Sequence, residues 1–334
     1  MKKLSSWIFI FLLSGTILIS MSCMTGWRGE DRDFRHDMRS FVQAISEYAR
    51  AKSAGFVIIP QNGSALATLD GDPGGAPAAE YLAAIDGMGR EDLNYGYDGD
   101  NIATSGMDKN EMIPFLDLAT ASGVTILVTD YCSETTKMDD SYTSNQTRGY
   151  ISFAADSRDL DTIPTYPQNP FAVHGSSVEN LSDAKNFLYL LDPSQYQSKT
   201  AYLGALRATD FDAIIFDLFY EDAEGTVWEL TSSDLAQIKT KANGGQRLLI
   251  CYTSIGEAED YRYYWDPSWN FFRPSWLDRQ NPNWRGNYKV QYWNPDWQAL
   301  IFGGSNAYLD KILSAGFDGV YLDIIDAYEY FESG

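Results

Sequence analysis

Short apolar runs alternate with amphipathic helical patterns along most of this chain, and this alternation limits the folds that it can adopt. Several runs are apolar at nearly every position, as at 124–129, 213–216 and 319–322. A strand that is apolar on both faces must be covered on both sides, and helices between consecutive strands provide that cover for a parallel sheet. We therefore expect a parallel sheet packed against helices.

The pattern predicts eight strands, at 56–59, 93–95, 124–129, 186–191, 213–216, 247–252, 288–293 and 319–322. Helices are predicted at 38–54, 112–122, 232–242 and 307–315, and a long polar loop at 133–176. Eight strand–helix units in one chain of this length are typical of a (β/α)8 barrel. A doubly wound sheet is the alternative, but no G-x-G-x-x-G turn follows the first strand. We predict an α/β chain that forms a single-domain (β/α)8 TIM barrel over 38–334.

The first residues have the pattern of an export signal. A positively charged start precedes an apolar run at 7–19, which is shorter than a transmembrane helix. Small residues then lead to Cys23, as before the lipidated cysteine of a lipoprotein, although Ser20 stands where such signals usually have Leu. We predict a signal peptide over 1–22, lipidation of Cys23 and a tether over 23–37. The protein would then be exported and held at a membrane by the lipid anchor alone; ordinary secretion or a periplasmic location is the alternative.

Charge and rare residue types exclude several functions. The formal charge is −21, so no basic stripe neutralises phosphates, and we expect no nucleic-acid partner. Two histidines are too few for most zinc sites or Ser-His-Asp triads, and three cysteines exclude a disulfide scaffold. We expect no metal and no cofactor, and catalysis by carboxylates. A calcium or magnesium site is the rival interpretation, although no EF-hand spacing supports it.

Acidic residues follow several predicted strands, at the end where a (β/α)8 barrel builds its active site. They include Asp130 with Tyr131, Asp192, Asp217, Glu257 with Glu259, and Asp323 with Asp326. Carboxylates that converge raise one another's pKa, so that one acid stays protonated beside an ionised partner. Glycoside hydrolysis uses such a pair, one acid for the leaving oxygen and one carboxylate as base or nucleophile. For each single Asp, a loop cap or a salt bridge is an equal alternative.

Aromatic residues indicate a carbohydrate ligand. Six of the nine tryptophans lie between 265 and 297, in a polar part of the chain. Tryptophan and tyrosine offer flat apolar faces with a polar edge, which suit sugar rings. We expect some of these rings to staple an irregular loop and others, Trp265 and Trp293 among them, to stack on sugars.

Three segments resemble a known family. They are Phe216-Asp217-Leu218-Phe219, the Ser-Ile-Gly-Glu-Ala-Glu-Asp-Tyr-Arg run at 254–262, and the run at 316–326 that ends in Tyr-Leu-Asp-Ile-Ile-Asp. They resemble the barrel family related to endo-α-1,4-polygalactosaminidase, glycoside hydrolase family 114. The chain is most similar to an archaeal and bacterial branch whose members are often labelled cysteinyl-tRNA synthetase-like extracellular proteins. The resemblance covers roughly 38–332, and no His-Ile-Gly-His or Lys-Met-Ser-Lys-Ser motif supports the synthetase label.

The resemblance implies an exported glycosidase that hydrolyses a galactosamine-type polysaccharide. Glu259 or Glu257 would be the general acid, Asp323 its carboxylate partner, and Asp217 an orienting group or alternative base. The predicted substrate-binding residues are Asp130, Tyr131, Tyr252, Arg262, Trp265, Trp293 and Asp326.

The last predicted strand departs from the family pattern. The hydrolases tend to carry Val-Glu-Pro-Asp where this chain has Val-Tyr-Leu-Asp, so Tyr321 replaces a family carboxylate. Glu257 stands where the hydrolases more often have a small residue. A non-catalytic carbohydrate-binding lipoprotein on the same barrel is therefore the alternative function. The acidic charge favours a cationic substrate such as a partly deacetylated amino-sugar polymer; charge spread evenly for solubility is the alternative.

Replacement of the predicted lipidation site tests the anchor. The change Cys23→Ser, or treatment with globomycin, should move the protein from the membrane fraction to the soluble fraction, because the lipid alone is expected to hold it there. Cell fractionation followed by immunoblotting measures the distribution. Unchanged partitioning of the variant would rule out the anchor.

Overall fold

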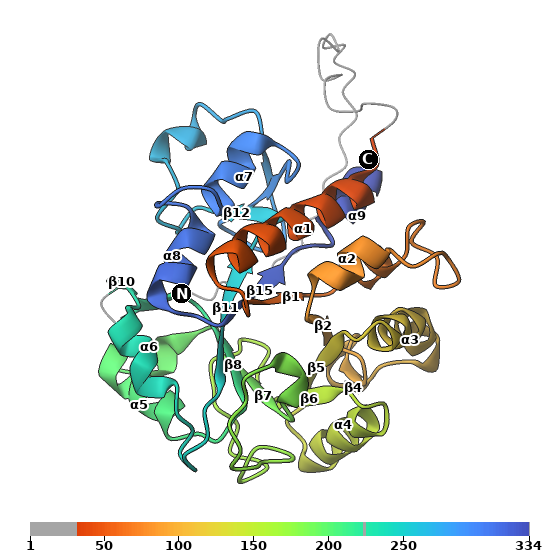
Figure 1. Ribbon diagram of the computed structural model, residues 1–334, viewed down its shortest axis with the longest axis vertical. Helices are drawn as coiled ribbons and strands as arrows, with labels where there is room; N and C mark the ends of the chain where they lie inside the picture. The colour runs from red at the N-terminus through yellow and green to blue at the C-terminus, as the bar shows by residue number, and fades with distance from the viewer. Residues whose placement is uncertain (1–31, 223–224, 334) are drawn as a thin grey trace, which may run out of the picture. The chain divides into compact units, whose positions relative to one another are not determined.

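The computed structural model describes residues 32–222 and 225–333 (Figure 1). The chain divides into two units, Met1–Asp33 and Phe34–Gly334, and every helix and strand described here belongs to the second. The predicted signal peptide and Cys23 lie outside the described residues. Within the described residues, no helix combines the length and the apolar character that crossing a bilayer requires.

Two parallel sheets form the centre of the second unit. The larger has the strand order β1 (Val57–Pro60), β15 (Gly319–Asp323), β11 (Leu248–Ser254), β8 (Ala213–Phe216) and β7 (Phe187–Tyr189). The smaller has the order β2 (Gly87–Glu91), β5 (Thr125–Tyr131) and β6 (Ile151–Ala155). A parallel bridge between Gln61 and Gly89 joins β1 to β2, and β6 lies beside β7. The predicted parallel α/β fold is confirmed, and closure into a barrel stays a prediction.

Helices lie on the outside of these strands (Figure 1). They are α1 (Phe34–Lys52), α2 (Ala79–Ala84), α3 (Gly106–Ala121), α4 (Thr135–Thr147), α5 (Lys199–Arg207), α6 (Ser232–Ile238), α7 (Pro295–Ile301), α8 (Tyr308–Ala315) and α9 (Ala327–Ser333). The buried face of α1 carries Phe41, Val42, Ile45 and Ala49, which recur at helical spacing. It begins at Phe34, so the last residues of the predicted tether are helical.

Smaller elements lie in the connections between the strands of the two parallel sheets. Two hairpins, β3 (Tyr95–Gly96) with β4 (Gly99–Ala103) and β9 (Phe219–Glu221) with β10 (Val227–Glu229), follow β2 and β8. Between β11 and α7, the 255–294 segment forms an antiparallel sheet of β12 (Glu257–Glu259), β14 (Asn287–Val290) and β13 (Leu277–Gln280). The single-turn helices are η1 (Ser64–Ala67), η2 (Leu181–Asp183), η3 (Pro193–Gln195) and η4 (Pro267–Asn270).

Two predicted strands of the central sheet were wrong, and two real ones were missed. The run at 288–293 overlaps β14 of the side sheet, and the run at 93–95 lies just after β2. The true second strand, β2, was missed because its sequence Gly-Met-Gly-Arg-Glu has little apolar character. The predicted loop at 133–176 contains α4 and β6; α4 is mostly polar, and β6 ends in two alanines.

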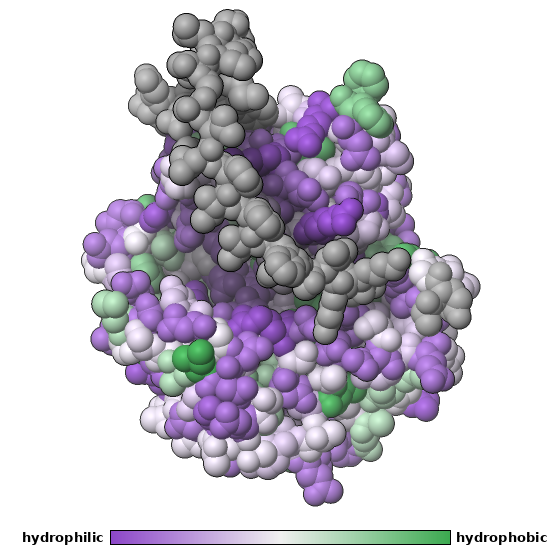
Figure 2. Space-filling view, turned by 180° about the vertical axis from the view of Figure 1, so that it is seen from behind, coloured by the Kyte–Doolittle hydropathy of each residue, from purple (hydrophilic) through white to green (hydrophobic). Residues whose placement is uncertain are grey.

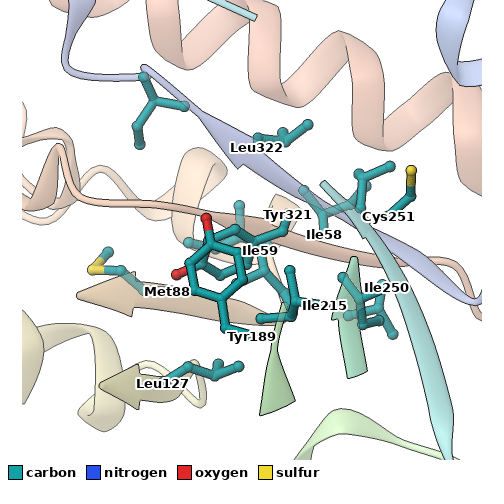
Figure 3. Packing of buried hydrophobic residues seen from close by; sticks show 14 of the residues in the cluster. Ile58, Ile59, Met88, Leu127, Tyr189, Ile215, Ile250, Cys251, Tyr321 and Leu322 are labelled. Atoms are coloured by element: carbon teal, nitrogen blue, oxygen red, sulfur yellow. The ribbon is translucent and has the colours of Figure 1, made fainter. Parts of the chain in front are cut away.

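A glycine on β2 makes room for a tyrosine in the core. Side chains from strands of both sheets meet in one cluster, in which the rings of Tyr189 and Tyr321 lie together with centroids 5.2 Å apart (Figure 3). A Cβ on Gly89 would stand 2.0 Å from the Tyr321 hydroxyl oxygen. The glycine that hides β2 from sequence reasoning is therefore required by packing.

The change Gly89→Ala should lower the free energy of unfolding by about 1–3 kcal/mol, because a methyl group is forced against a buried, rigid ring. Urea denaturation measures the loss. Tyr321→Phe should recover part of it in the double variant, since the nearest clashing atom is removed. Full stability of Gly89→Ala alone would show that the ring has room to move.

Candidate active site

Asp323, the last residue of β15, is a carboxyl group in a largely desolvated position. The Tyr252 hydroxyl on neighbouring β11 donates a hydrogen bond to Asp323 Oδ2 at 2.6 Å. Burial raises the pKa of Asp323 to about 7; the hydrogen bond from Tyr252 opposes this rise, and the charge of Glu91 adds to it. The residue nevertheless keeps part of its surface exposed to solvent. Near pH 7 this group is both a proton donor and a proton acceptor.

Glu91 ends β2 and is the carboxylate that acts on Asp323 from the other side of β1. The Tyr131 hydroxyl donates to Glu91 Oε1, and the Asn62 amide donates to Oε2 at 3.0 Å. The Glu91 backbone N–H donates in turn to Asn62 Oδ1 at 3.2 Å. Glu91 is half-buried and has no cationic partner within hydrogen-bond distance among the described residues. Neutral donors therefore orient it and leave acceptor capacity for a substrate or water.

Two further charged residues, Asp326 and Arg90, lie at the same carboxyl-terminal edge of the strands β15 and β2. Burial raises the pKa of Asp326 to about 6, with a contribution from Glu329, while Lys289 opposes the rise. Burial lowers the pKa of Arg90, which lies in the field of Glu91 and Asp326, and its Nε has no hydrogen-bond partner among the described residues. This edge thus combines two carboxyl groups with raised pKa values, Asp323 and Asp326, with the guanidinium of Arg90.

Glu259, the predicted general acid, lies in a buried ion-pair cluster. Arg262 donates from Nε to Glu259 Oε2 at 2.6 Å and from Nη1 to Asp217 Oδ2 at 2.7 Å. The Tyr261 hydroxyl donates to Glu259 Oε1 at 2.6 Å, and the Tyr308 hydroxyl lies 3.3 Å from Asp217 Oδ1. Both oxygens of Glu259 are occupied and its charge is balanced. This geometry fits a group that fixes the 255–294 segment to β8 rather than one that transfers a proton.

Glu257, the other predicted acid, is also buried and paired. Lys289 Nζ lies 2.6 Å from Glu257 Oε1. Asn281 donates to Oε1 at 2.8 Å and Asn287 to Oε2 at 3.2 Å. Glu257 thereby connects β12 with β14 and the turn before it, and no face of its carboxylate is open.

Three of the predicted substrate-binding residues lie close to Asp323 or Glu91, and another does not. Tyr252 donates to Asp323, Tyr131 donates to Glu91, and Asp326 lies in the electrostatic field of Asp323. Asp130 is fully buried and accepts hydrogen bonds from Asn94, Tyr95, Ser141 and Asn145, so it holds the β3 turn and α4 behind the site.

The tryptophans mostly pack against one another. Trp265 is half-buried among Trp269 and Tyr288, with ring centroids 5.2 and 4.9 Å away. Trp293 packs on Phe34, the first residue of α1, and on Phe331, near the end of α9. These contacts correspond to the stapling role that the sequence left open; they do not place Trp293 beside Asp323.

Sequence reasoning missed Glu91 and Arg90, because it did not identify β2. The sequence signal for this strand was weak, because Met88 is the one large apolar residue of β2 before the charged run Arg-Glu-Asp at 90–92. Within the described residues, no group of three His, Cys, Asp or Glu side chains has the geometry to hold a metal ion. The expected absence of a cofactor stays a prediction.

Comparison with known proteins agrees with the motifs. Residues 179–334 match the model of Glycoside-hydrolase family GH114, which confirms the GH114-like resemblance of this part of the chain. An uncharacterized protein of Methanocaldococcus jannaschii is 36% identical over 174 residues, 50% of this chain and 47% of the relative. Uncharacterized proteins of Deinococcus radiodurans (42% over 127 residues, 38% of this chain and 37% of the relative) and Thermotoga maritima (32% over 156, 47% and 45%) are also similar. The chain spans less than half the length of each relative.

Removal of the Tyr252 hydroxyl should raise the pKa of Asp323 above about 7, because the hydrogen bond that favours the ionised form is lost. A hydrogen bond to a charged group predicts a rise of about one pH unit. A 13C NMR titration of the carboxyl in Tyr252→Phe measures it. Tyr261→Phe, which removes a donor to Glu259 instead, is the control and should leave Asp323 unchanged. A lowered pKa in Tyr252→Phe would contradict the geometry.

Proposed function

We propose that this protein is an exported glycoside hydrolase that acts on an amino-sugar polysaccharide with Asp323 and Glu91 as its pair of carboxyl groups. The observation that carries the proposal is the raised pKa of Asp323 beside the charge of Glu91, in a half-buried position. A carboxyl group kept protonated near pH 7 next to an oriented carboxylate is the equipment of glycosidic hydrolysis.

The pair needs the two sheets to join at β1 and β2, as they do when a (β/α)8 barrel closes. The strand order supports this closure, since β1 and β2 are bridged, β6 adjoins β7, and neighbours in space follow one another along the chain. Side chains from strands of both sheets also share one core. Asp323 and Glu91 then stand two strands apart, about 10 Å between backbones at the usual strand spacing. Inward side chains bring the carboxyls closer than that.

The two groups have different roles in this proposal. Asp323, in its protonated form, donates a proton to the leaving oxygen of the glycosidic bond. Glu91 faces the developing positive charge on the sugar and acts as base or nucleophile. Tyr131 and Asn62 fix its orientation, and Tyr252 fixes that of Asp323. Glu259 and Arg262 are positioning residues.

The family resemblance and the acidity of the edge support the amino-sugar substrate. Asp323, Asp326 and Glu91 attract a polymer that carries ammonium groups, and the chain's charge of −21 adds to this field. Arg90 is the nearby donor for a neutral acceptor such as an acetamido carbonyl. Partly deacetylated poly-galactosamine offers both groups.

The changes Asp323→Asn and Glu91→Gln should each reduce turnover of an amino-sugar polymer by at least about 10²-fold with the fold retained, because general acid–base work is lost. Reducing-end release from a panel of such polymers measures turnover. The rate of the unaltered protein should fall as the pH rises through about 7, where the Asp323 carboxyl loses its proton.

Glu47→Gln, on the outer face of α1, is the matched control and should keep full activity. Activity that survives both Asp323→Asn and Glu91→Gln would reject this pair and return attention to Asp217. Binding of the polymer without any turnover in the unaltered protein would favour the carbohydrate-binding alternative.

A further inference from the structure

Apolar rings stand far out of the surface in the 255–294 segment. Phe271 and Phe272, directly after η4, are 84% and 81% exposed, and Trp284, in the turn between β13 and β14, is 65% exposed. On the face drawn in Figure 2, hydrophilic residues predominate and hydrophobic ones form small separate groups. Adjacent rings this exposed mark a surface that meets another apolar phase.

The same stretch carries exposed arginines, in a chain with 46 acidic and 25 basic residues. Arg273, Arg279 and Arg285 are exposed, and none forms an ion pair with a carboxylate among the described residues. Arg273 donates to the Asp278 carbonyl at 3.1 Å, which joins the Phe271 stretch to β13. We define the aromatic–arginine surface as Phe271, Phe272, Arg273 and Arg279, which lie on the two stretches that the hydrogen bond from Arg273 to Asp278 joins.

The folded unit begins beside this surface. The Arg279 guanidinium lies 4.9 Å from the centre of the Tyr330 ring. Tyr330 and Phe331 have ring centroids 4.8 Å apart, and Phe331 and Phe34 have centroids 5.5 Å apart. From Phe34 back to the predicted lipidation site is 34 − 23 = 11 residues, which span at most about 40 Å. A lipid on Cys23 would thus hold the start of the folded unit, at Phe34, within about 40 Å of a bilayer.

We propose that the aromatic–arginine surface docks onto an anionic lipid bilayer next to the anchor. Phenylalanine partitions into the boundary between headgroups and acyl chains, and arginine binds lipid phosphates with a planar fork of donors. A diacyl lipid on Cys23 would hold the chain at the membrane by itself, and this surface would orient the folded unit there. The remaining acidic surface is repelled, so the unit is held in one orientation. This docking is independent of the proposed hydrolysis.

Hydrogen exchange of the full, lipidated chain tests the docking. The chain is reconstituted in vesicles of phosphatidylcholine with phosphatidylglycerol, and in phosphatidylcholine alone, after mass spectrometry has shown the lipid on Cys23. Amides of 267–280 should be protected only in the anionic vesicles. One arginine at an anionic surface contributes about 1 kcal/mol, so Arg273→Gln should lower the protection about fivefold. The double change Phe271→Ser/Phe272→Ser should abolish it.

Met107→Ser, at another highly exposed apolar residue on α3, is the matched control and should keep the protection. Three results would each overturn the proposal: no lipid on Cys23, equal exchange in both kinds of vesicle, or protection by an amino-sugar polymer or by self-association in detergent without vesicles. Turnover of a soluble polymer should not change in the Phe271→Ser/Phe272→Ser variant, which separates this proposal from that of hydrolysis.

Discussion

Removal of water from one carboxyl group is the physical effect on which the candidate site depends. Asp323 ends β15, on which the buried ring of Tyr321 packs against that of Tyr189. Burial is the largest cause of the raised pKa of Asp323. Tyr321, two residues earlier on β15, is fully buried and occupies space that a side chain on Gly89 would take. The absence of a side chain at Gly89 thus permits the packing of Tyr321, and the charge of Glu91, two residues beyond that glycine, contributes to the raised pKa of Asp323. The Gly89–Tyr321 packing contact and the two candidate carboxyl groups therefore lie on the same two strands, β2 and β15.

The partners of each carboxylate separate structural from chemical roles. Glu257 and Glu259 are buried against Lys289 and Arg262, and in each pair the cation offsets part of the cost of removing the carboxylate from water. Asp323 and Glu91 receive hydrogen bonds from tyrosine hydroxyls and an amide instead. Without a balancing cation, burial shifts the protonation equilibrium of Asp323 to neutral pH. The partner of each carboxylate, a cation or a neutral donor, is therefore the observation that separates the two proposed kinds of role.

Sequence reasoning predicted what local patterns determine. Strands such as β8 and β15 are apolar at nearly every position, and the expectation that acidic residues follow the strands agrees with the position of Asp323 at the end of β15; its role in catalysis stays a prediction. Sequence reasoning failed at β2, where Gly89 is required by Tyr321, a residue more than two hundred positions away in the chain. It also did not anticipate the ion pair between Glu259 and Arg262, because that contact depends on how the 255–294 segment folds back. Long-range contacts of this kind leave no periodicity to read.

The two candidate groups come from different halves of the chain. Asp323 lies within the GH114-like residues 179–334, which supply β7, β8, β11 and β15. Glu91 lies before them, on β2, and reaches the site because β1 pairs with β15 and bridges to β2. The matched residues alone therefore contain one carboxyl of the proposed pair and lack its partner. The proposed pair depends on the β1–β15 pairing as much as on either acid, since this pairing and the β1–β2 bridge bring β2 and β15 to the two sides of β1.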